Sequence, residues 1–168
     1  MVNDRENAVL SALRNGSDIV EKPISWLWNP FLARYKLGLL AARGGAMKTS
    51  IMTDLAARIS VGGLSPDKRT HLDKGHVLFV TTEDDPDDTL MPRFHAAGGD
   101  PEIITFLSSS EHHLNFDEHP EDLEIILENR PKIDFVILDP ITSMTGNTNT
   151  HMESAVKRLA GIVAGIAK

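Results

Sequence analysis

With 168 residues, of which 41% are hydrophobic and 24% charged, the chain has the composition of one soluble domain that is large enough for a core. Its net charge of −7 excludes a free-standing electrostatic DNA-binding protein, and the absence of cysteine excludes disulfides and thiolate metal sites. No stretch has the apolar length of a signal peptide or a membrane span, so the cytoplasm is the expected location.

Two segments precede the first predicted strand. Residues 1–22 are polar with a short amphipathic patch, and we interpret them as an N-terminal extension that contains a frayed or docked helix. Residues 23–30 carry Trp26 and Trp28 between two prolines and predict a loop whose tryptophans pack against the body. Residues 23–168 are expected to form a single core.

Short apolar runs predict four strands, and helical spacing of apolar residues predicts the helices between and after them. The predicted strands are Lys36–Ala41, His76–Thr81, Ile103–Leu107 and Asp134–Asp139. The predicted helices run from near Lys48 to Gly62, from Asp85 to Gly98, over Glu121–Arg130 and over Glu153–Ile166. Strands that alternate with helices over short connections indicate an α/β fold, with a mostly parallel sheet covered by helices on both faces.

The helix after residue 84 has clear local signals. Asp85 stands at the position of an N-cap and Pro86 in the first turn, while Gly98 follows the last apolar position. Pro92 lies inside this helix and is expected to kink it. Arg93 is a candidate for contact with phosphate or a neighbouring subunit, although an arginine on a helix surface is more often solvated or ion-paired.

The segment from residue 36 to residue 58 has the strand–loop–helix order of a P-loop. Gly44 and Gly45 allow the backbone to approach phosphate, Lys48 supplies a positive charge, and the Thr49 hydroxyl is a candidate Mg²⁺ ligand. The candidate nucleotide-binding residues are Arg43, Gly44, Gly45, Ala46, Met47, Lys48, Thr49 and Ser50. The alternative is a Gly-Gly turn followed by an exposed lysine.

This loop departs from the P-loop pattern at Ala42 and Met47, where the pattern has glycine. One methyl group at the start of the loop is the milder change. Met47 places a long, flexible thioether next to the expected phosphate position. Two outcomes stay open: the side chain turns away and leaves the site usable, or it fills the site.

Carboxylates follow two of the predicted strands. Glu83 comes just past the second strand, where open α/β sheets bind ligands, and is the candidate that orients or deprotonates an attacking water. Asp139 ends the fourth strand and is a candidate Mg²⁺ ligand, although apolar strands that end in aspartate are common. The alternative, an acidic helix start, explains Asp85 better than it explains Glu83, which precedes the helix.

Together these elements resemble the RepA-like, RecA-fold ATPases of plasmids and phages, which are relatives of hexameric replicative helicases. The resemblance covers roughly residues 22–168. It is most specific in the segment from Thr82 to Arg93, Thr-Glu-Asp-Asp-Pro-Asp-Asp-Thr-Leu-Met-Pro-Arg.

The resemblance implies a RecA-like domain that hydrolyses ATP with Mg²⁺ in DNA replication. Lys48 and Thr49 would bind the phosphates and the metal, Glu83 would be the catalytic carboxylate, and Asp139 would be the Walker B acid. A homo-oligomeric ring is the implied assembly. Single-stranded DNA has no support from charge, since the loop Thr142–Thr150 contains no lysine or arginine.

The chain ends before the next strand, the sensor motif and the arginine finger of that family, which predicts a truncated homologue or an N-terminal part. Other functions therefore stay open. They are a nucleotide-binding or interaction module that does not hydrolyse ATP, an inactive fragment, and a small-molecule kinase. The kinase has the least support, because the chain has no arginine-rich lid segment.

Overall fold

The computed structural model describes residues 4–115, 118–119, 121–130, 132–144 and Lys157. At its centre is a three-stranded parallel sheet with the strand order β4–β3–β5. The strands are β3 (His76–Thr81), β4 (Ile104–Ser108) and β5 (Ile133–Asp139). The predicted α/β fold with a parallel sheet is confirmed, and three of the four predicted strands form within one residue of their expected bounds.

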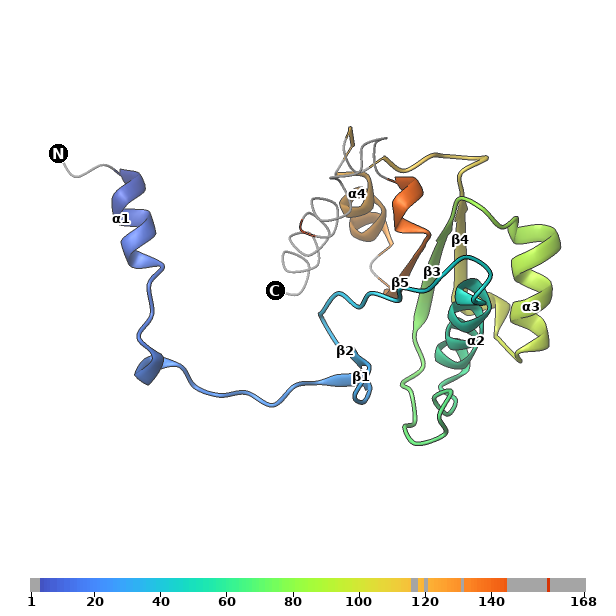
Figure 1. Cartoon of the computed structure of the whole chain (residues 1–168), viewed down its shortest axis with the longest axis horizontal. Coiled ribbons are helices and arrows are strands. Elements are labelled where there is room, and N and C mark those ends of the chain that lie inside the picture. Colours follow the sequence, from blue (N-terminus) through green and yellow to red (C-terminus); the bar gives the residue numbers. More distant parts are fainter. Residues whose placement is uncertain (1–3, 116–117, 120, 131, 145–156, 158–168) are drawn as a thin grey trace.

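Helices cover both faces of this sheet (Figure 1). The helices α2 (Lys48–Val61) and α3 (Met91–Ala96) lie on one face, and α4 (Asp122–Asn129) lies on the other with the 3₁₀ helix η4 (Ile141–Met144). Alternate side chains of β3 enter the two apolar layers. The first layer includes Leu55, Val77, Phe79 and Phe94, and the second includes Leu78, Val80, Leu123 and Met144.

The direction of α2 is set by its contact with the start of β3. The N–H group of Gly75, just before β3, donates to the carbonyl of Ile59 near the end of α2 at 3.1 Å. Gly62 then ends the helix in the left-handed conformation, with φ of 69°, as the sequence predicts. A 14-residue helix is about 21 Å long and a six-residue strand about 20 Å. The chain then reverses between α2 and β3, so the N-terminus of α2 points toward the carboxyl end of β3.

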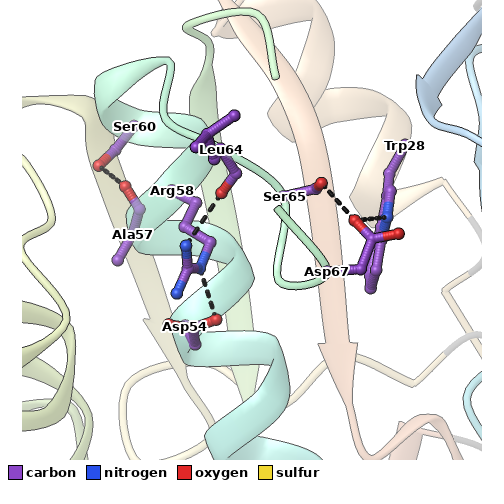
Figure 2. Close-up of polar contacts among 8 residues, drawn as sticks. All are labelled: Trp28, Asp54, Ala57, Arg58, Ser60, Leu64, Ser65 and Asp67. Atoms are coloured by element: carbon purple, nitrogen blue, oxygen red, sulfur yellow. Dashed lines mark hydrogen bonds and ion pairs between the residues drawn. The ribbon is translucent and has the colours of Figure 1, made fainter. Parts of the chain in front are cut away.

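A short hairpin replaces the predicted loop around the tryptophans. Strands β1 (Trp26–Trp28) and β2 (Leu32–Ala33) pair antiparallel. The indole N–H group of Trp28 donates to Asp67 at 3.2 Å, which joins the hairpin to the loop after α2 (Figure 2). Trp28 also packs against the first apolar layer, as expected of a tryptophan that anchors rather than stacks on a ligand.

The N-terminal segment forms an arm outside the body (Figure 1). It contains the predicted helix, α1 (Asp4–Ser11), and a 3₁₀ turn, η1 (Gly16–Asp18). None of the residues of α1 is buried, so in the part of the chain that the structure describes this helix is not docked. The division between an extension and a core at residue 22 stays a prediction.

The predicted strand Lys36–Ala41 does not form. These residues are exposed coil, with Leu39 61% exposed. A strand requires a hydrogen-bonded neighbour, and no backbone hydrogen bond joins residues 36–41 to the sheet in the described ranges. Gly38 also weakens a strand, because it adds backbone entropy and no side chain to pack. An apolar run predicts burial but does not identify the strand with which it pairs.

The helix after residue 84 has two parts. A π-helical turn, η2 (Pro86–Leu90), continues into α3, and the change falls directly before Pro92, which has no N–H group to donate. Asp85 is the predicted N-cap, and its carboxylate accepts from the N–H group of Asp87 at 2.8 Å. A 3₁₀ turn, η3 (Pro101–Ile103), leads into β4. The predicted helix Glu153–Ile166 and most of the loop Thr142–Thr150 lie outside the described residues.

Candidate functional site

Two acidic residues meet at the carboxyl edge of the sheet. Thr81 at the end of β3 is paired with Asp139 at the end of β5, and the N–H group of Thr82 donates to the carbonyl of Asp139 at 3.2 Å. Glu83 follows directly and is exposed, whereas Asp139 is partly buried. Within the described residues, neither carboxylate forms a hydrogen bond or an ion pair with another side chain, so both are available to a ligand at this edge.

The N-terminus of α2 is the second part of the candidate site. It has no side-chain cap and no acidic residue in its first turn. The first N–H groups of a helix lack partners within the helix, and they attract anions together with the helix dipole. Lys48 is the first residue of α2 and is partly buried. These features suit the binding of a phosphate group.

Met47 has a backbone conformation that glycine adopts more easily. It is the N-cap of α2 and lies in the left-handed region, with φ of 58° and ψ of 28°. This conformation costs a residue with a Cβ atom about 1–2 kcal/mol, which explains why the P-loop pattern has glycine here. The side chain is 69% exposed and so turns toward solvent. Which of the two outcomes considered for Met47 holds stays a prediction.

The loop before α2 lies apart from the rest of the fold. Residues 36–47 are exposed, and a Cβ atom added at Gly44 or Gly45 would meet nothing within 4 Å. In the part of the chain that the structure describes, no hydrogen bond or ion pair joins residues 42–50 to Glu83 or Asp139. The structure therefore places the two acids at the ends of adjacent strands, without contact between the loop before α2 and these acids.

The Asp139 carboxylate at this edge is the kind of oxygen ligand that a magnesium ion combines with the oxygens of a bound ligand. Among the described residues, no group of three or more His, Cys, Asp or Glu could hold a metal ion by itself. Mg²⁺ usually has one or two carboxylate ligands and shares the phosphates of its substrate and water. Asp139 would provide such a carboxylate, and Thr49, in the first turn of α2, would provide a hydroxyl.

A family model described as an AAA domain matches residues 4–168. The chain belongs to this family. A search of curated proteins finds no match to the chain. Membership indicates a nucleotide-binding domain of the P-loop ATPase type, which agrees with an α/β fold that has acidic residues at the carboxyl edge of a parallel sheet. Among the described residues of this AAA domain, no helix combines the length and apolarity that crossing a bilayer requires.

The structure of the AAA domain also decides between the alternatives for Arg93 and identifies one contact that sequence analysis missed. Arg93 forms an ion pair with Asp84 at 3.2 Å, so the ion-paired interpretation of Arg93 is the one observed. Thr81, which was predicted only as the last residue of a strand, hydrogen-bonds to the turn that carries Glu83. A hydroxyl side chain immediately before a turn is the signal that predicts such a contact.

Proposed function

We propose that this AAA domain binds ATP and hydrolyses it with Mg²⁺, as a RecA-like ATPase related to RepA-type hexameric DNA helicases. The observation that carries the proposal is the position of Glu83 and Asp139 at the ends of adjacent parallel strands, on the carboxyl edge of the sheet. Open α/β sheets bind their ligands at this edge. The family supports nucleotide binding, and the sequence resemblance supports the narrower relationship.

Each site residue has a role that follows from its chemistry. Lys48 and the first N–H groups of α2 would bind the β- and γ-phosphates and stabilise the charge that develops on them. Glu83 would accept a hydrogen bond from the attacking water and orient it toward the γ-phosphate. Asp139 and Thr49 would hold Mg²⁺, which neutralises phosphate charge when it is bound.

The same proposal includes a ring of identical subunits that acts in DNA replication in the cytoplasm. It rests on the resemblance of the segment from Thr82 to Arg93 and on the exposed position of Glu83, which a neighbouring subunit can approach. The net charge of −7 gives no support for strong contact with single-stranded DNA. Such contact is therefore the weakest part of the proposal.

Calorimetric titration with ATP and Mg²⁺ tests the binding step. We expect saturable binding that Lys48→Ala weakens at least about tenfold, since the substitution removes the charge nearest the phosphates. The matched control is Lys22→Ala, which removes an exposed lysine from the N-terminal arm and should leave the affinity unchanged. Folded wild-type protein that does not bind ATP, or equal losses in the two variants, would contradict the proposal.

A second candidate function is a nucleotide-binding module that does not hydrolyse ATP. The exposed coil at residues 36–47 favours it, because this coil has no hydrogen bond to the acids at the sheet edge in the described chain. The two functions differ in turnover. ATP binding without phosphate release, at every protein concentration tested, would select the module over the ATPase.

A further inference from the structure

The turn that carries Glu83 is closed by a single buried hydroxyl. The Thr81 side chain is 2% exposed. Its Oγ1 atom donates to the carbonyl of Asp84 at 2.8 Å and accepts from the N–H group of Asp84 at 3.2 Å. Thr82 and Glu83 are thus the two middle residues of a turn whose ends are tied together.

The residues before Glu83 are also bonded to the strands on both sides. The Thr82 N–H group donates to β5 at Asp139, at 3.2 Å. On the other side, the N–H group of Ser109 donates to the Thr81 carbonyl at 3.0 Å. The backbone on the N-terminal side of Glu83 is therefore fixed in the sheet, whereas the side chain of Glu83 is exposed.

An ion pair fixes the C-terminal side of the turn. The Asp84 carboxylate lies 3.2 Å from the Arg93 guanidinium of α3, and the side chains are 33% and 47% exposed. Ion pairs with this exposure add little to stability. The pair joins the turn to a helix that is held in the core by Phe94, which is 0% exposed.

We propose that Thr81, Asp84 and Arg93 are positioning residues that hold Glu83 in the orientation needed for water attack. The inference rests on the proposed ATPase function and deepens it. Thr81 fixes the turn by its two backbone contacts, and the Asp84–Arg93 pair fixes it relative to α3. Arg93 acts through Asp84 in this arrangement and does not touch the phosphates.

Steady-state ATP hydrolysis and ATP binding by three variants test the inference. Arg93→Ala and Asp84→Asn remove the pair from either side, and Thr81→Val removes the hydroxyl while keeping the shape of the side chain. Because small displacements of a catalytic group lower rates strongly, we expect kcat to fall about 10- to 100-fold in each variant. The Kd for ATP should stay close to that of the wild type in all three variants. The melting temperature should also stay close in Arg93→Ala and Asp84→Asn, whereas Thr81→Val loses two hydrogen bonds and should melt a few degrees lower while remaining folded.

Three controls accompany these variants. Thr81→Ser keeps the hydroxyl and should restore most of kcat. The double variant Asp84→Arg with Arg93→Asp reverses the pair and should recover more activity than either single change. Lys74→Ala breaks a pair of similar geometry at the opposite edge of the sheet, where Lys74 lies 3.1 Å from Asp100, and should leave kcat unchanged.

The outcomes separate this inference from the function on which it depends. A normal kcat in Arg93→Ala or in Thr81→Val overturns the positioning role alone. A fall in Arg93→Ala with weaker ATP binding, and with normal turnover in Asp84→Asn, overturns it in favour of direct contact between Arg93 and phosphate. Wild-type protein that binds ATP without turnover overturns both the ATPase function and the positioning role.

Discussion

The backbone N–H group of Thr82 donates to the carbonyl of Asp139 at 3.2 Å, which joins the residue before one candidate catalytic acid to the other acid itself. Thr82 and Asp139 are 57 positions apart in the sequence (139 minus 82). They meet because β3 and β5 are parallel neighbours that end at the same level. We therefore expect a substitution of Glu83 to affect ATP hydrolysis, and a substitution of the acids in the following helix turn to leave it unchanged.

Glu83→Gln is expected to remove ATP hydrolysis and leave ATP binding intact. The amide keeps the size of the side chain but cannot accept a proton, so kcat should fall about 10²- to 10⁴-fold. Phosphate release and calorimetry measure the two quantities. The matched control is Asp87→Asn, because Asp87 is an exposed acid in the following helix turn whose role the helix dipole explains. A comparable loss of kcat in the control would contradict a specific role for Glu83.

Met47→Gly is expected to stabilise the domain. Glycine relieves the left-handed strain at φ of 58° but adds entropy to the unfolded chain, so we expect a net gain of about 0.5–1 kcal/mol in the free energy of unfolding. Urea denaturation measures it. Ala46→Gly is the control, since Ala46 has no positive φ and should gain nothing. Equal effects of the two changes would show that Met47 is not strained.

We expect the hairpin of β1 and β2 to detach from the loop after α2 at acid pH, because its contact with Asp67 requires an ionised carboxylate. The Ser65 hydroxyl at 2.6 Å, with smaller effects of the Arg69 N–H group and the Trp28 indole, lowers the pKa of Asp67 below its ordinary value of 3.8. A group with a lowered pKa stabilises the folded state above its unfolded pKa, and the contribution is lost as the pH falls through the folded pKa. The docked Trp28 should therefore be unaffected above about pH 4 and released below it.

Fluorescence of a Trp26→Phe variant reports this transition from Trp28 alone. Ser65→Ala removes the largest cause of the lowered pKa, so the midpoint should move to higher pH. An unchanged midpoint would mean that the Ser65 contact does not set the titration of Asp67.

Phe79→Ala is expected to lower the free energy of unfolding by about 3–5 kcal/mol, because Phe79 is 0% exposed between α2 and the sheet. Chemical denaturation measures the change. Leu39→Ala is the comparison, since Leu39 is 61% exposed in the coil that was predicted to be a strand. It should cost less than about 0.5 kcal/mol. A cost above 1 kcal/mol would show that residues 36–41 pack in solution.

Local signals predicted those parts of the fold that depend on local chemistry. His76–Thr81 forms a strand with its expected bounds because its side chains are buried on both faces, which a continuous apolar run predicts. Asp85 caps its helix because its short carboxylate reaches the N–H group of Asp87, and Gly62 ends α2 because glycine adopts positive φ without strain. The strand at Lys36–Ala41 failed because pairing depends on a distant neighbour, which an apolar run does not specify.

In the candidate site, too, some features could be predicted from the sequence and others depend on the folded backbone. The position of Glu83 and Asp139 at one edge was predictable, because the carboxyl ends of parallel strands meet there. The left-handed Met47 and the Asp84–Arg93 pair were not, because each depends on how the backbone turns between elements. The sequence departed from the P-loop pattern at Met47, and the structure shows the same residue in a conformation that favours glycine.

The exposed coil before α2 also makes the chain open to proteolysis. Lys36 and Arg43 are exposed in irregular backbone, which is the kind of segment that proteases cleave first. Trypsin, which cuts after lysine and arginine, can divide the chain there without entering the two apolar layers around β3. Cleavage after Arg43 leaves α2 and the three-stranded sheet on one fragment and makes Gly44, four residues before Lys48, the new terminus, so limited digestion cuts the covalent link between the core and residues 1–43.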